Sequence, residues 1–219
     1  MFDLINALLV TLLALNLFAL GTSRIQSVIR IVAVQGALLG LLTLLMHDSL
    51  SFPVLLSGIA AVLIKGLVIP AVMMRSLRAA DIKREVEPFI GFLPSILLGA
   101  VATAAVILLF QALTAAGPAS AGAPIAPSLI APASVSTILV GFIILVSRYK
   151  AITQVLGYLV LENGIYIFGT LLVEAIPLVV EMGMLLDLFV GVFVISIITN
   201  HINRAFSSMD TRRLVSLKE

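Results

Sequence analysis

Long apolar runs separated by short polar stretches dominate the chain. A transmembrane helix needs about 20 mostly apolar residues, because each residue rises about 1.5 Å and the hydrocarbon core is about 30 Å thick. Seven segments meet this requirement, at 2–21, 25–46, 52–77, 89–115, 133–147, 152–173 and 177–203. The pattern therefore predicts an all-α, polytopic membrane protein with about seven transmembrane helices.

The only linker-like stretch lies at 117–132, which is rich in Ala, Pro, Gly and Ser and carries no charge. It divides the chain into a four-helix region at 1–116 and a three-helix region with a tail at 133–219. The prolines at its end leave the start of the fifth segment open, and that segment is short unless it begins near Ser128. The first segment carries Asp3 and no basic residue before its apolar run, so it is predicted to be a helix rather than a signal peptide.

Basic residues fall on alternate connections between the predicted helices. All of the 13 Lys and Arg residues except Lys65 follow the first, third, fifth or seventh segment. These twelve are Arg24, Arg30, Arg75, Arg78, Lys83, Arg84, Arg148, Lys150, Arg204, Arg212, Arg213 and Lys218. Because Lys and Arg are retained on the cytoplasmic side, we expect an external N-terminus, an external linker at 117–132 and a cytoplasmic C-terminus. The expected location is the cytoplasmic membrane of a bacterium or archaeon.

Composition agrees with a membrane protein and excludes several functions. The chain is 61% apolar and 11% charged, whereas soluble domains are about 25% charged. No basic stripe interleaved with aromatic residues is present, which argues against nucleic-acid binding. The chain has no Cys, and its only histidines are His47 and His201, so no disulfide, iron–sulfur cluster, thiolate metal site or haem is expected. We expect no cofactor, metal or catalytic centre in this chain.

Three ionisable residues lie near the middle of predicted spans: Lys65, Glu162 and Asp187. Each costs about 2.5–3.5 kcal/mol to insert at the helix centre, so such residues usually mark ion or proton routes. Opposite signs at similar depth suggest mutual compensation. The alternative is structural, since a buried pair can simply hold neighbouring helices together.

The neighbours of these residues differ. Glu162 has Tyr158 and Tyr166 four residues to either side and Asn163 next to it, which gives one helical face several polar groups. Lys65 precedes Pro70, so we expect a kink beside the cation.

Asp187 lies between Gly183 and Gly191, which permit close approach of another helix. Two further residues are weaker candidates for the path. Glu181 is expected near its external entrance, and His201 near its cytoplasmic end as an interfacial residue or proton acceptor.

At these residues the sequence resembles component E of hydrogenase-4, the formate hydrogenlyase type of membrane-bound hydrogenase. The resemblance is carried by Arg148-Tyr-Lys150, Gly157-Tyr158, Leu161-Glu162-Asn163-Gly164, Val180-Glu181-Met-Gly183 and Asp187-Leu-Phe-Val-Gly191. It extends along the chain to Ile64-Lys65-Gly-Leu-Val-Ile-Pro70 and to the tail at 210–218. The tripeptide Glu162-Asn163-Gly164 is its most specific part.

The last three segments are also similar to the K subunit of respiratory complex I and the C subunit of Mrp-type cation/proton antiporters. Those three-helix proteins have a basic loop before the second helix and an acidic residue in each of the second and third. Glu162 matches the first carboxylate, and Asp187 stands where the complex I subunit normally has Glu. The side chain here is shorter by a methylene.

The resemblance implies a non-catalytic subunit of a multisubunit membrane-bound [NiFe] hydrogenase. The nickel–iron centre and iron–sulfur clusters would lie in partner subunits. The implied partners are antiporter-like membrane subunits, a membrane protein like the complex I H subunit, and the soluble hydrogenase arm. Glu162, Asp187 and Lys65 would then belong to a proton or cation path, with Tyr158, Tyr166, Asn163, Glu181 and His201 as possible lining residues.

Three alternatives remain open from the sequence. The chain could be a structural membrane scaffold, a subunit of an Mrp-type antiporter or other complex I-like assembly, or a self-sufficient secondary transporter. The last is disfavoured because no clear internal repeat is present.

Overall fold

The computed structural model describes residues 2–46, 52–79, 90–116 and 129–172, and the regular elements among them are all helices. The all-α prediction is therefore confirmed for this part of the chain. The elements are α1 (Phe2–Gly21), α2 (Ile25–Met46), α3 (Phe52–Ala61), η1 (Val62–Val68), α4 (Ile69–Ala79), α5 (Phe92–Ala116), α6 (Ile130–Ser147) and α7 (Ala151–Leu172).

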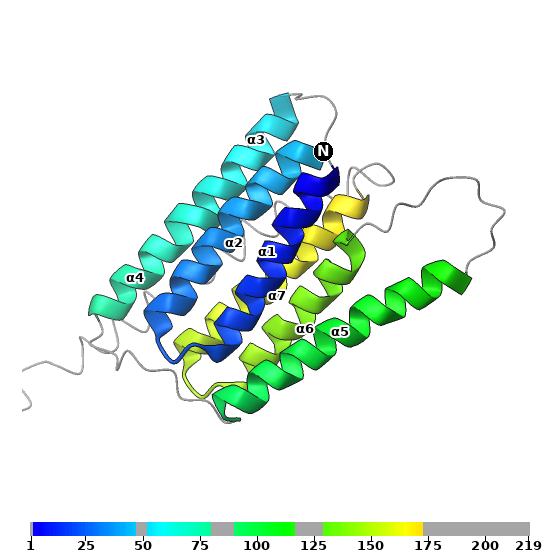
Figure 1. The fold of residues 1–219 in the computed structure, drawn as a ribbon. Coiled ribbons are helices and arrows are strands. Elements are labelled where there is room, and N and C mark those ends of the chain that lie inside the picture. Colours follow the sequence, from blue (N-terminus) through cyan, green and yellow to red (C-terminus); the bar gives the residue numbers. More distant parts are fainter. Residues whose placement is uncertain (1, 47–51, 80–89, 117–128, 173–219) are drawn as a thin grey trace, which may run out of the picture.

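The helices form one bundle that mixes both sides of the predicted linker. Helices α3 and α4 follow one line along the left edge in Figure 1, α2 lies beside them, and α5 runs along the opposite edge. The most extensive contact joins α6 to α7, while α1 packs against α6 and α2 packs against α7. Segments far apart in the sequence thus meet in the interior.

Five stretches in the described residues are long and apolar enough to cross a membrane, which agrees with a membrane protein. They are Phe2–Gly21, Ile25–Met46, Val54–Arg75, Phe92–Ala115 and Ile130–Ser147. The sixth predicted segment corresponds to α7, a helix of 22 residues, and the seventh, 177–203, lies outside the described residues. A total of seven spans therefore stays a prediction, as does the orientation of the termini.

Helix α6 begins at Ile130, three residues before the predicted start at 133. Pro132 falls in its first turn, where a backbone N–H would have no partner within the helix, so the proline costs no hydrogen bond. The first bond of the helix runs from the Ala133 N–H to the Leu129 carbonyl at 2.8 Å.

The third segment contains a π-helix, η1, in place of the expected kink. The N–H of Ile69 donates to the carbonyl of Ile64, five residues earlier, and the next residue, Pro70, has no N–H. The wider turn takes up the irregularity around the proline, and α3 and α4 continue in one direction (Figure 1). Short π-helices inside α-helices are often found at functional sites.

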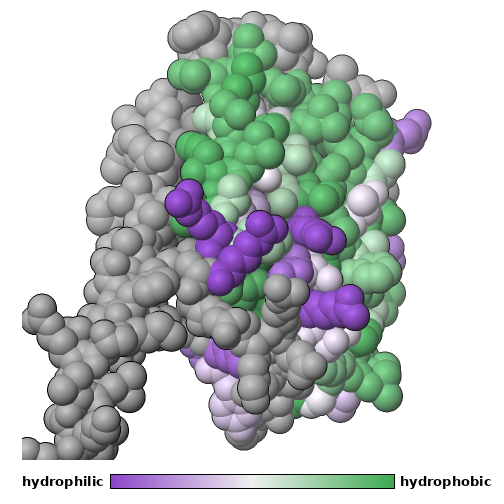
Figure 2. Space-filling view, turned by 90° about the vertical axis from the view of Figure 1, so that its left-hand side faces the viewer, coloured by the Kyte–Doolittle hydropathy of each residue, from purple (hydrophilic) through white to green (hydrophobic). Residues whose placement is uncertain are grey.

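The described connections that carry basic residues lie at one end of the bundle. The turn from α1 to α2, the end of α4 and the turn from α6 to α7 gather at the lower end in Figure 1, whereas the N-terminus lies at the other end. Figure 2 shows hydrophilic residues concentrated in the lower half of the face turned toward the viewer, below a mostly hydrophobic area. This common end fits the alternation of charge in the sequence.

Candidate functional site

Two separate apolar clusters fill the interior of the bundle, one toward each end. The first includes Leu20, Val32, Met73 and Val160, and the second includes Leu12, Leu39, Ala133 and Ile167. On each of α1, α2, α6 and α7, the buried polar side chains nearest the middle of the helix lie between residues of the first cluster and residues of the second. Together with Lys65 of η1 they form a set that we call the polar layer, which consists of Asn16, Gln35, Lys65, Thr137, Glu162 and Asn163.

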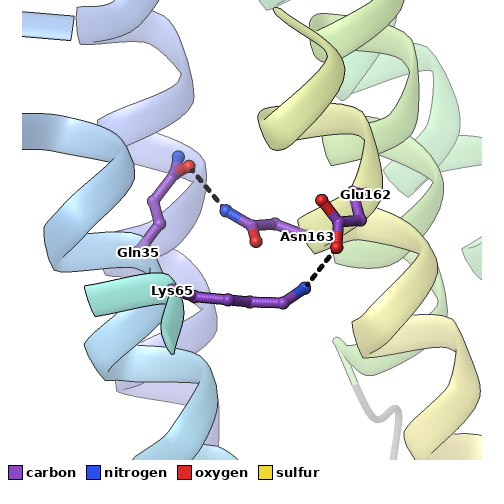
Figure 3. A network of polar contacts seen from close by, with 4 residues as sticks. All are labelled: Gln35, Lys65, Glu162 and Asn163. Carbon is purple, nitrogen blue, oxygen red and sulfur yellow. Dashed lines mark hydrogen bonds and ion pairs between the residues drawn. The ribbon is translucent and has the colours of Figure 1, made fainter. Parts of the chain in front are cut away.

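Lys65 and Glu162 form an ion pair within the polar layer. The Lys65 Nζ lies 3.3 Å from Glu162 Oε1, and the side chains are 8% and 6% exposed (Figure 3). The lysine comes from η1 in the N-terminal region and the glutamate from α7 in the C-terminal region. The structure thus brings together two of the three predicted path residues across almost 100 positions of sequence.

Glycines allow the backbones to approach closely at this depth. A Cβ at Gly36 of α2 would lie 2.6 Å from the carbonyl carbon of Lys65, and a Cβ at Gly164 of α7 would lie 2.6 Å from the Ile138 nitrogen of α6. Such distances leave no room for a side chain. The ion pair is therefore placed by tight helix packing, as expected where small residues line helix interfaces in membranes.

A chain of hydrogen bonds leads from Asn163 across the bundle to α6. Asn163 Nδ2 donates to Gln35 Oε1 at 3.3 Å (Figure 3), and Gln35 Nε2 donates to Asn16 Oδ1 at 2.8 Å. Asn16 Nδ2 donates to Thr137 Oγ1 at 2.8 Å, and the Thr137 hydroxyl donates to the Ala133 carbonyl at 2.7 Å. Because every donor points from α7 toward α6 and amide groups do not titrate, this chain orders the helices without adding a charge.

Tyr166 also contacts the cation of the ion pair, and Thr43 contacts Tyr166. Tyr166 follows Glu162 by one helical turn, and its ring centroid lies 4.8 Å from the Lys65 Nζ. Its hydroxyl lies 2.7 Å from Thr43 Oγ1, and the Thr43 hydroxyl donates to the Leu39 carbonyl at 3.0 Å. Tyr158, the other predicted tyrosine, is half-buried one turn before Glu162.

A second buried cation, Arg148, lies at the end of the bundle where the basic connections gather. Its Nη2 donates to the Leu20 carbonyl at 2.8 Å, and its guanidinium carbon lies 5.2 Å from the centre of the Phe92 ring. Burial lowers the pKa of Arg148 below its ordinary value, but arginine stays protonated in proteins. The residue joins the ends of α1 and α6 to the start of α5. It therefore has a structural role in addition to the role expected from sequence, which is to set the orientation of the chain in the membrane.

The remaining sequence candidates, Asp187, Glu181 and His201, lie outside the described residues. In the described part of the chain, no group of three or more His, Cys, Asp or Glu residues could hold a metal ion. Sequence reasoning missed Asn16, Gln35 and Thr137, which all lie inside apolar segments. An amide side chain within such a segment is the signal that could have found Asn16 and Gln35, whereas Thr137 stands beside Ser134 and Ser136 and has no such signal.

Comparison with known proteins gives one relative that covers most of the chain. The "Uncharacterized protein Rv0085" of Mycobacterium tuberculosis is 30% identical over 197 residues, which is 89% of this chain and 87% of the relative. The chain belongs to the family of Rv0085. No family model matches the Rv0085-like chain, and no solved structure matches it.

A second similarity is shorter. "Hydrogenase-4 component E" of Escherichia coli is 31% identical over 80 residues, which is 36% of this chain and 37% of that protein, and the Shigella flexneri protein of the same name matches equally. The resemblance inferred from sequence is thus shown over about a third of the chain. It gives a weak link to hydrogenase-4 component E.

Proposed function

We propose that this chain is a non-catalytic membrane subunit of a hydrogenase-like complex, in which the Lys65–Glu162 pair takes part in moving protons or cations across the bilayer. The observation that carries this proposal is the buried ion pair itself, at 3.3 Å between the two halves of the bundle. Intramembrane charges are costly and usually face ion routes or one another. The partial similarity to hydrogenase-4 component E supports placing this chain in a complex with redox subunits.

In this proposal Glu162 accepts a proton at a carboxylate oxygen and later releases it to the next acceptor along the path. Lys65 compensates the carboxylate when it is charged. Asp187 is a further carboxylate of the path by sequence, with Glu181 and His201 toward its ends. The chemistry that drives the cycle would occur at a [NiFe] centre and iron–sulfur clusters in partner subunits of the formate hydrogenlyase type.

The second candidate is a structural scaffold, with membership of an Mrp-type or complex I-like assembly as a related alternative. The ordered amide chain favours the scaffold, because it joins α7, α2, α1 and α6 by hydrogen bonds deep in the interior. In this case the ion pair only holds η1 against α7.

The decisive variant is the neutral pair Lys65→Met with Glu162→Leu. Replacing both members of a buried ion pair by apolar residues is often neutral for stability, because the desolvation cost of the charges disappears as well. We expect the complex to assemble in normal amounts but to lose donor-driven proton or sodium movement in membrane vesicles of the native host. The Asp187→Asn variant is expected to have the same effect.

A matched control removes one charge of each sign from exposed positions, with Asp3→Leu and Arg78→Met. This control should assemble and move ions as the wild type does. Normal ion movement in the neutral-pair variant would exclude the path and leave the scaffold. Absence of redox subunits from the complex purified through a tag on this chain would exclude the hydrogenase-like assignment.

A further inference from the structure

Protonation of Glu162, the central step of the proposed path, removes the negative charge that compensates the Lys65 ammonium. The ammonium lies in the interior at 8% exposure, and its interaction with the Glu162 carboxylate loses the negative charge when the proton binds. A buried cation is stable only with compensating interactions. The ammonium therefore needs a second interaction that does not depend on the charge of Glu162.

The face of the Tyr166 ring meets this need. The Lys65 Nζ lies 4.8 Å from the ring centroid, within the distance of about 6 Å at which a cation is attracted to an aromatic face. Tyr166 and Glu162 are one turn apart on α7, so both reach the same ammonium. A ring face attracts the cation without accepting its proton.

The ring is held by a hydrogen bond from α2 and, independently of its hydroxyl, by packing against the apolar cluster that includes Leu12, Leu39 and Ile167. The Thr43 hydroxyl donates to the Leu39 carbonyl at 3.0 Å, so Thr43 Oγ1 is available to accept a hydrogen bond from the Tyr166 hydroxyl, 2.7 Å away. Thr43 is itself buried at 6% exposure. The ring thus stays beside the ammonium when the carboxylate changes its protonation state.

We infer that the aromatic face of Tyr166 holds the Lys65 ammonium while Glu162 is protonated, and this inference rests on the proposed path through the ion pair. Tyr166 is a positioning residue in this role. The working group is the ring, whereas the sequence had indicated the hydroxyl as a path-lining group.

Ring variants separate the two roles of Tyr166. Tyr166→Phe keeps the aromatic face and removes the hydroxyl, while Tyr166→Leu removes the face. Tyr166→3,4,5-trifluorophenylalanine keeps the shape of Phe and withdraws electron density from the face. The quantities to measure are the number of ions moved per electron pair in vesicles and the amount of assembled complex.

We expect Tyr166→Phe to retain the wild-type ratio of ions to electrons. The trifluoro variant should lower this ratio clearly below that of Tyr166→Phe, with no change in assembly, because it weakens the cation–π attraction and keeps the shape of the ring. Tyr166→Leu should lower it at least as much. Phe168→Leu, which removes an exposed aromatic residue from the same helix, should have no effect.

Equal losses in the Phe and trifluoro variants, or wild-type ratios in both, would overturn the role of the ring. The neutral-pair variant distinguishes this failure from failure of the proposed function. If that variant still moves ions, the path itself is wrong. If it moves none while the trifluoro variant matches the wild type, only the inference about Tyr166 is wrong.

Discussion

Helices α7 and α5 show opposite arrangements of polar and apolar residues. On α7 the polar residues Glu162 and Asn163 are buried, while Ile165 is 52% exposed. On α5 the apolar residue Val101 is 66% exposed, and only 11% of the span is buried within the protein, against 56% for α6. Exposed apolar residues thus mark the surface expected to face lipid or another subunit, and buried polar residues mark the interior.

The two helices also differ in the kind of contact that joins them to the rest of the bundle. Helix α7 contacts its neighbours through backbone approaches at glycine, an ion pair and amide hydrogen bonds, whereas α5 contacts α1 and α6 mainly through side chains. Substitutions in the interior are therefore expected to act strongly, and those on the outer face of α5 weakly. The following variants test this ranking from the largest effect to the smallest.

The largest effect is expected for Gly141→Leu, which tests the backbone contact of α6 with α7. A Cβ at Gly141 would lie 2.3 Å from the backbone nitrogen of Leu161, so a side chain there forces the two helices apart. We expect the variant to fail to accumulate as monodisperse protein in size-exclusion chromatography after detergent extraction. Gly169→Leu is the control, because nothing lies within 4 Å of a Cβ at that position, and equal yields of the two variants would contradict the prediction.

Lys65→Met alone should cost about 3–5 kcal/mol in the free energy of unfolding, because it leaves the Glu162 carboxylate buried without its cation. Adding Glu162→Leu should recover most of this loss. The measurement is equilibrium unfolding in mixed detergent micelles, analysed as a double-mutant cycle. Additive effects of the two substitutions would show that the residues do not interact.

Gln35→Leu should cost about 2 kcal/mol in the free energy of unfolding, since it removes the acceptor of Asn163 and the donor to Asn16 together. Hydrogen exchange of the α2 and α7 amides should accelerate in parallel. Gln111→Leu on α5 is the matched control, because Gln111 is exposed. If the Gln35→Leu protein is as stable as this control, the amide chain does not contribute to the free energy of unfolding.

The smallest effect is expected for Leu108→Cys on α5, where the leucine is 64% exposed. The free energy of unfolding should change by less than about 0.5 kcal/mol. Because the chain has no other cysteine, a maleimide dissolved in the membrane should label this site selectively. Leu156→Cys, at a fully buried position of α7, should stay unlabelled, and equal labelling would contradict the assignment of inner and outer faces.

Much of the fold could be predicted because helices in lipid must satisfy their own backbone hydrogen bonds, which makes span length readable from apolarity. The first two helices, for example, match the predicted segments 2–21 and 25–46 at both ends. The π-helix could not be predicted, because Pro70 requires an irregularity without specifying its form. The start of α6 at Ile130 could not be predicted either, because it requires Pro132 to lie in the first turn of the helix, where a proline costs no hydrogen bond.

Within the candidate site, the sequence indicated Lys65 and Glu162 by the cost of placing a charge in lipid. It did not indicate that Asn16, Gln35 and Thr137 are joined to one another and to Asn163 by hydrogen bonds, because these bonds connect residues up to 128 positions apart. Polar residues of this kind are individually tolerable in a membrane helix. Their association becomes evident only when the helices are packed.

The sequence by itself determined that the chain is helical, apolar enough for a membrane, and provided with a few charges at the middle of its spans. These properties follow from local composition and period. Only the tertiary structure decided that Lys65 pairs with Glu162, that the amides form a directed chain and that the Tyr166 ring lies beside the ammonium. Each of these contacts joins helices that are separate in the sequence, so it exists only in the packed bundle, where glycines let the backbones of α2 and η1 and of α6 and α7 approach closely.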